Sequence, residues 1–210
     1  MALAFGGKSS TGVLVPLLIL ADVFAVVHYR HDVNWKVLFK LMPSLVIGVL
    51  LGVVVGKNLD PAVFKKVMAG IIFFSGIMMA IVQRVQKEAI PNSFCFSGLM
   101  GLGAGFTTMI GNLAGSFANL YFLALRFPKR EFIGTAAWMF FFVNIFKLPF
   151  HIFVWGTITT KTLQVNLYLA PLVVLGFLIG IRFIKYISTK VFHKYIIVMT
   201  VLSSILILIK

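Results

Sequence analysis

The stretch GLMGLGAGFTTMIGN, from Gly98 to Asn112, places five glycines and two threonines within fifteen residues of a largely apolar chain. Glycine weakens a helix by about 1 kcal/mol relative to alanine. Inside a bilayer, a broken helix is tolerated only where protein or a water-filled cavity satisfies its backbone. We therefore expect a break between Gly98 and Gly105, with a half-helix starting there. The alternative is close packing of unbroken helices, which small residues four apart, such as Gly101 and Gly105, permit.

The composition around this stretch is typical of an all-α, polytopic membrane protein. Hydrophobic residues make up 60% of the 210 positions, charged residues only 11%, and the mean hydropathy is +1.05. A spanning helix needs about 20 mostly apolar residues. With a glycine-broken hairpin over 94–126, we expect about seven or eight transmembrane or half-membrane helices in the cell membrane. The other candidate spans lie near 10–28, 41–56, 67–83, 132–154, 163–183 and 194–209.

The charge and cysteine content exclude several classes of function. The net charge is +14, but the Lys and Arg residues are spread among the gaps between spans, which indicates loop charge rather than nucleic-acid binding. A single cysteine, Cys95, excludes an intramolecular disulfide and a multi-cysteine metal site. No catalytic motif is present. We therefore expect no enzyme activity, cofactor, metal site or nucleic-acid partner.

The chain aligns with itself as two repeats, 1–88 and 89–210. A shift of 128 positions aligns 41–82 with 169–210, and a shift of 122 pairs Asp22 with Asn144 and Gly12 with Gly134. The first repeat has no counterpart of 89–129. We therefore expect it to lack about forty N-terminal residues, through a late start, a shortened chain or a genuine loss.

The loop charges favour an inverted arrangement of the repeats over a parallel one. If the 94–126 hairpin enters and leaves on one face, twelve Lys and Arg lie on one side of the membrane and six on the other. A single crossing by 94–126 would give a weaker split of eleven to seven. Inverted repeats are common in secondary transporters, whose substrate site lies near the bilayer midplane.

Only a few ionisable residues fall inside predicted spans, where charge is costly and commonly functional, and two of them are Asp22 and Lys147. Asp22 is either a structural partner, in a salt bridge or beside a helix break near Pro16, or a coupling or gating group. Lys147 is either a contact for an anionic substrate or the counter-ion of Asp22. Pro149 follows Lys147 and predicts a kink in the helix. The candidate coupling or gating residues are Asp22, Pro16 and Pro149. We interpret His151, beside Trp155, as an interfacial anchor rather than a proton relay.

The polar residues after the glycines would complete an anion site. A half-helix starting at the glycines would direct backbone N–H groups and its positive dipole end at a negative ion. Hydroxyl and amide groups would add further contacts. The candidate substrate-binding residues in this segment are Gly103, Gly105, Thr107, Thr108 and Asn112.

Residues 10–52 and the segment FIGTAAWMFFFVNIFKLPF, residues 132–150, resemble the sulfite exporter TauE/SafE family of membrane permeases. The resemblance implies a carrier of two similar halves that moves small sulfur-containing anions such as sulfite, sulfonates or related organic acids. It maps the family's glycine-rich segment onto one hairpin here, although members usually carry one in both halves. The polar positions that it implies are Thr135, Asn144 and Lys147 in the second half, and Thr11, Pro16 and Asp22 in the first.

The leading hypothesis from the sequence is a secondary permease that works by alternating access. Its expected partners are a small anionic substrate and the lipid bilayer, and a homo-oligomer is compatible with the sequence. The alternative is a channel-like or structural membrane subunit, or a non-transporting remnant of such a permease.

Overall fold

The computed structural model describes residues 7–58, 60, 63, 66, 70, 73, 74, 77 and 93–209. The ordered elements in this part of the chain are all helical, which confirms the predicted all-α class. Most of the span expected at 67–83 lies outside the described residues. The elements are α2 (Gly7–Tyr29), α3 (Trp35–Asn58), α5 (Phe94–Gly111), α6 (Ala114–Ala124), α7 (Lys129–Pro149), the π-helical turn η1 (Phe150–Val154), α8 (Thr160–Lys185) and α9 (Thr189–Ile209).

Five of the described helical segments are long and apolar enough to cross a membrane: Ser10–Tyr29, Trp35–Lys57, Phe94–Gly111, Lys129–Val154 and Thr160–Lys185. Helix α6 has only 11 residues, too few to span about 30 Å of hydrocarbon. Because α6 folds back along α5, the two form the helical hairpin that the sequence predicted over 94–126.

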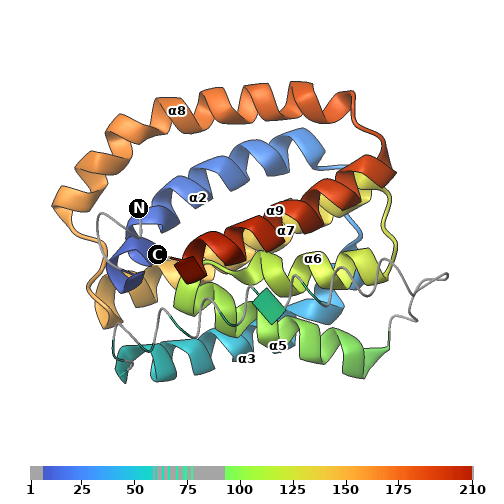
Figure 1. Cartoon of the computed structure of the whole chain (residues 1–210). Coiled ribbons are helices and arrows are strands. Elements are labelled where there is room, and N and C mark those ends of the chain that lie inside the picture. The colour runs from blue at the N-terminus through green and yellow to red at the C-terminus, as the bar shows by residue number, and fades with distance from the viewer. Residues whose placement is uncertain are drawn as a thin grey trace.

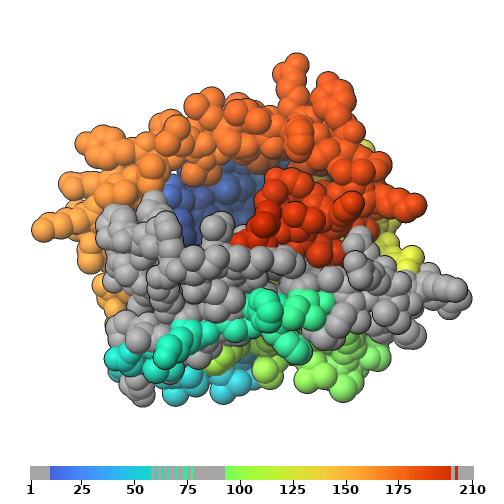
Figure 2. Space-filling view, in the orientation of Figure 1, coloured from blue at the N-terminus to red at the C-terminus, as the bar shows by residue number. Residues whose placement is uncertain are grey.

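The helices lie side by side in a layered bundle, with α8 on one flank and α3 on the other (Figure 1). Helix α3 packs closely on α5, and its Leu41, Leu45 and Val49 are fully buried in the core. Helix α8 contacts α2 and leaves most of its surface exposed. In the space-filling view, a hollow separates α8 from α9, and α2 forms its floor (Figure 2).

Helix α5 runs unbroken through the glycines, so the predicted break between Gly98 and Gly105 is wrong. These glycines serve close packing instead. A Cβ atom added at Gly105 would collide with the carbonyl of Leu45, and one added at Gly48 would collide with the carbonyl of Leu102. The cost of glycine in a helix is offset because the two backbones come into direct contact, as small residues allow in membranes.

The chain is interrupted instead at Asn112 and Leu113, between α5 and α6. Asn112 has a left-handed backbone with φ of 57°, a conformation that asparagine tolerates better than most residues. Its N–H donates to the carbonyl of Thr108 at 2.9 Å, and the N–H of Leu113 donates to the carbonyl of Thr107 at 3.2 Å. These bonds satisfy carbonyls at the end of α5, so the turn can lie within the protein.

Helices α2 and α7, which the internal alignment pairs, pack against each other in opposite directions. Gly12, near the start of α2, lies against Thr157, which follows the end of α7. Gly134, near the start of α7, lies against Asp32, which follows the end of α2. Matching positions therefore sit at opposite ends of the pair.

Pro16 in α2 and Pro149 in α7 differ in their effect on helix continuity. Helix α2 continues through Pro16, so no helix break lies beside Asp22. Helix α7 ends at Pro149 and passes into η1, where the N–H of Trp155 donates to the carbonyl of Phe150 at 2.9 Å. The expected irregularity near Pro149 is thus a π-helical turn.

Candidate functional site

A buried hydrogen bond joins the middles of α2 and α7. The side-chain Nδ2 of Asn144 donates to Oδ2 of Asp22 at 2.6 Å, and the two residues are 3% and 9% exposed. A hydrogen bond to a charged carboxylate is stronger than one between neutral groups. The structure therefore brings two of the predicted site residues into direct contact.

Lys147 lies one helical turn beyond Asn144, and its side chain is fully buried. Its Nζ donates to Thr108 Oγ1 at 3.1 Å, to the carbonyl of Thr108 at 3.5 Å, and to Oδ1 of Asn112. These acceptors lie at the C-terminal end of α5, where the helix dipole favours a cation. Lys147 thus ties α7 to the tip of the hairpin.

The charge of Lys147 has no direct counter-ion in the part of the chain that the structure describes. No described carboxylate forms an ion pair with its Nζ within 4.0 Å, and Asp22 is held by Asn144 instead. Burying an ammonium group costs several kcal/mol, which neutral oxygens offset only in part. Within the described residues, neutral oxygens of Thr108 and Asn112 are therefore the direct partners of this buried cation.

Asn112 connects three segments at this point. Its Oδ1 accepts from Lys147, and its Nδ2 donates to the carbonyl of Thr11 at 3.0 Å. Thr11 is 2% exposed. The hairpin tip is therefore anchored to both α2 and α7, and helix α6 begins two residues later at Ala114.

The other hairpin residues predicted for the site are engaged elsewhere. The hydroxyl of Thr107 donates to the carbonyl of Gly103 at 2.8 Å within α5. Gly103 faces the ring of Phe117, and Gly105 contacts the backbone of Leu45. These three residues shape and pack the hairpin, so its contacts to Lys147 come from Thr108 and Asn112.

Thr135 lies at the opposite end of α7 from Lys147, twelve residues or roughly 18 Å away along the helix. Its hydroxyl accepts from the backbone N–H of Asn34 at 2.9 Å. The structure does not bring Thr135 to Lys147.

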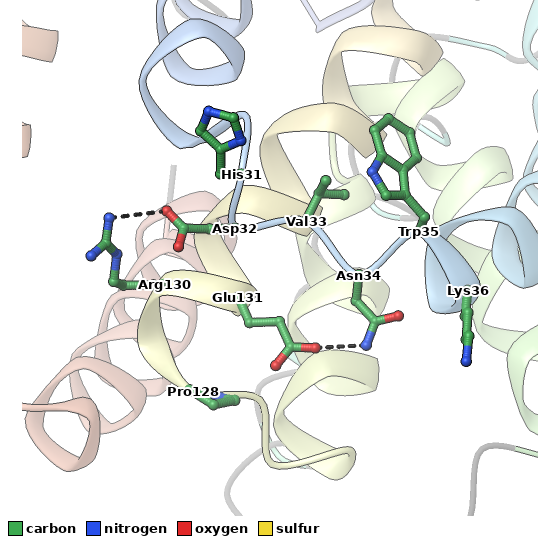
Figure 3. Close-up of a pocket in the computed structure, with 9 residues that line it drawn as sticks. All are labelled: His31, Asp32, Val33, Asn34, Trp35, Lys36, Pro128, Arg130 and Glu131. Atoms are coloured by element: carbon green, nitrogen blue, oxygen red, sulfur yellow. Dashed lines mark hydrogen bonds and ion pairs between the residues drawn. The ribbon is translucent and has the colours of Figure 1, made fainter.

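An open pocket of about 620 Å³ lies at the Thr135 end of α7. Figure 3 shows two polar contacts beside it: Arg130 pairs with Asp32 at 3.2 Å, and Asn34 Nδ2 donates to Glu131 Oε1 at 2.6 Å. Acidic and basic side chains both line this pocket, so its charges largely offset one another. The contacts fasten the α2–α3 loop to the start of α7.

A second pocket borders the Asp22 carboxylate. It has a volume of about 230 Å³ and lies among α2, α6, α7 and α9. Its lining is mostly apolar, and Lys147 is not part of it. The lining residues are Asp22, Ala25, Asn119, Phe132, Ile133, Ala136, Ala137, Phe140 and Phe192.

His151 is fully buried, which contradicts its interpretation as an interfacial anchor. Its Nδ1 lies 2.9 Å from Thr157 Oγ1, and its ring packs edge-on against Trp155 with ring centres 5.2 Å apart. The sequence carried a signal for this burial. Asn144, Lys147 and His151 are spaced by three and four residues, so they occupy one face of a helix. Within the described ranges, no three His, Cys, Asp or Glu side chains gather as metal ligands would.

The family model described as Sulfite exporter TauE/SafE matches residues 1–207. This match covers nearly the whole chain and confirms the resemblance inferred from the sequence. No curated protein and no solved structure matches the chain.

Proposed function

The chain belongs to the sulfite exporter TauE/SafE family, and from this premise we propose that it is a secondary permease for a small, sulfur-containing anion such as sulfite or a sulfonate. The family and the five candidate spans support a protein that works within a lipid bilayer.

One observation carries the proposal: Lys147 is a fully buried ammonium group without a carboxylate partner among the described residues. An anion beside Nζ would compensate its charge in a low-dielectric setting, where such attraction is strong. Thr108 and Asn112 hold the ammonium group in place and offer a hydroxyl and an amide to the same ion.

Helix α6 contributes to the proposed anion site because it begins beside Asn112. Its cap residue, Leu113, provides no side-chain hydrogen bond. The first N–H groups of a helix and the positive end of its dipole attract anions. The anion cradle that we propose therefore consists of the N–H groups of Ala114 and Gly115, the side chain of Asn112 and Lys147, because the N–H groups of residues 112 and 113 are already bonded.

Asp22 is suited to couple the anion to a proton. Once an incoming anion compensates the charge of Lys147, the carboxylate of Asp22 would remain as a buried negative charge without a counter-ion. Protonation of Asp22 would restore neutrality, and a neutral site costs less in a medium of low dielectric constant. The bond from Asn144 to Asp22 links this proton site to the helix that carries Lys147.

Alternating access would follow from an inverted pairing of repeats 1–88 and 89–210. Two observations support this arrangement: α2 and α7 run in opposite directions, and their matching residues Asp22 and Asn144 meet at the middle. Rocking about this contact would open one end of the α2–α7 pair while the other end closes.

Sulfite flux into liposomes that contain the purified full chain tests the proposal. We expect Lys147→Gln to lose at least tenfold in flux, because it removes the charge that holds the anion. Lys161→Gln is the matched control, since Lys161 is exposed at the start of α8, and it should keep wild-type flux. If correctly inserted wild-type protein carries no sulfur-containing anion, the transport proposal is wrong and a channel-like or structural subunit, or a non-transporting remnant, is favoured.

A further inference from the structure

The hydrogen bonds around His151 favour one placement of its ring proton. The hydroxyl of Thr157 lies 3.3 Å from the carbonyl of His151, to which it can donate, and the same oxygen lies 2.9 Å from His151 Nδ1. A hydroxyl has only one proton to donate, and we assign it to the carbonyl, which makes Nδ1 the N–H donor to Thr157 Oγ1. In a neutral imidazole, Nε2 then bears a lone pair and acts as an acceptor.

This Nε2 acceptor is buried and has no hydrogen-bond partner in the described part of the chain. An unsatisfied buried polar group is uncommon, because its lost hydration is not replaced. Trp138 and Asn166 also carry such atoms, but His151 differs from them because it lies four residues after Lys147. The chain passes from α7 into η1 between these two residues, and the charge of Lys147 acts on the ring of His151.

The ring of His151 is held in place on both sides. Its edge-on contact with Trp155 is supported because Trp155 Nε1 donates to the carbonyl of Val53 at 3.3 Å. Thr157 holds the Nδ1 side and is itself pressed against Gly12 of α2. Rotation of the ring would break these contacts. Nε2 is therefore a preorganised acceptor for a ligand that carries a hydrogen-bond donor, such as a hydroxyl group.

We propose that His151 Nε2 accepts a hydrogen bond from a hydroxyl group of the transported anion, so that the protein selects singly protonated oxyanions over anions without a hydroxyl. The inference rests on the proposed function, in which Lys147 holds the negative charge. Hydrogen sulfite, which has a charged oxygen and a hydroxyl, fits both contacts. Methanesulfinate has the same charge and the same pyramidal sulfur centre but a methyl group in place of the hydroxyl, so it would leave Nε2 unpaired.

The test compares flux of labelled hydrogen sulfite and methanesulfinate into liposomes containing the full chain, at one pH and without a gradient. Wild-type protein should prefer hydrogen sulfite by roughly tenfold, the effect of one buried hydrogen bond. His151→Phe keeps an aromatic ring against Trp155 but removes the acceptor, so it should abolish this preference mainly by slowing hydrogen sulfite. His151→Gln, whose Oε1 can accept, should restore part of it.

His193→Phe is the control, because His193 lies on α9 and contacts the carbonyl of Phe127; it should keep the preference. Size-exclusion profiles and thermal unfolding of each variant show whether it is folded. If folded His151→Phe keeps the wild-type preference, or slows both anions equally, the inference is overturned and Nε2 is satisfied by water or serves packing. Equal flux of both anions in the wild type contradicts the hydroxyl selectivity alone, whereas no flux of either contradicts the proposed function itself.

Discussion

Asn144 donates a 2.6 Å hydrogen bond to Asp22, the residue that it matches when the two halves of the sequence are aligned. Equivalent residues of two repeats can touch only near the axis that relates them. The contact between Asp22 and Asn144 therefore identifies the part of the molecule where an inverted pair of repeats would pivot. It also places the buried carboxylate one helical turn from Lys147.

Asp22→Asn should uncouple anion movement from the proton gradient. The substitution removes the proton-binding group but keeps an oxygen that can accept from Asn144. We expect exchange of anion across liposomes to persist, while an imposed pH gradient no longer drives accumulation. Asp60→Asn, at an exposed position, should respond to the gradient as wild type does. Gradient-driven accumulation by Asp22→Asn at the wild-type level would show that Asp22 has no coupling role.

Gly105→Ala should destabilise the protein by about 1 to 3 kcal/mol, because its Cβ would collide with the backbone of α3. Gly98→Ala is the matched control on the same helix, since no atom lies within 4 Å of a Cβ at that position. It should be neutral or stabilise by up to about 1 kcal/mol through helix propensity. Thermal unfolding in detergent measures both. Equal effects of the two substitutions would contradict the close contact between α3 and α5.

Substitutions at Asn112 separate its backbone role from its side-chain role. Asn112→Gly tolerates the left-handed backbone but loses the bonds to Thr11 and Lys147, so it should weaken anion affinity. Asn112→Ala loses the same bonds and also strains the backbone, which costs about 1 kcal/mol more. We therefore expect equal anion affinity in the two variants but a lower unfolding temperature for alanine. Wild-type affinity in either would exclude Asn112 from the site.

Thr135→Val should lower stability without changing anion affinity. It removes the acceptor for the N–H of Asn34 and leaves that group unpaired, at a cost of about 1 to 3 kcal/mol. Thr108→Val should instead weaken anion affinity, because Thr108 contacts Lys147 directly. Thermal unfolding with and without sulfite measures both quantities. A loss of affinity in Thr135→Val as large as that in Thr108→Val would mean that the substrate reaches both ends of α7.

The positions of the helices and of the buried charges could be predicted from the sequence, but several contacts could not. Apolar runs of sufficient length must be helices in a bilayer, and Lys147 within such a run must be buried or neutralised. The break in the hairpin was placed at the glycines because glycine weakens an isolated helix. In the fold, the same glycines strengthen the bundle through contact with α3, and the turn moves to Asn112.

For His151 and Thr135 too, the sequence did not predict which residues their side chains contact. His151 lies near Trp155 in a segment that ends a span, a pattern typical of an interfacial anchor, yet its ring is fully buried against Thr157 and Trp155. Thr135 shares a helix with Lys147, but its partner comes from the α2–α3 loop, about a hundred residues earlier in the chain. Sequence spacing specifies a helix face, whereas partners from other segments are set by packing.

From the sequence alone, the class, the family, the two-helix hairpin over 94–126 and the position of Asp22 and Lys147 within long apolar helices were determined, because hydrophobicity and helical spacing are local properties of the chain. Only the tertiary structure decided which carbonyls the glycines touch, where the hairpin turns, and that Asp22 binds Asn144 rather than Lys147. Those outcomes depend on how helices far apart in the chain approach one another, which no single segment encodes.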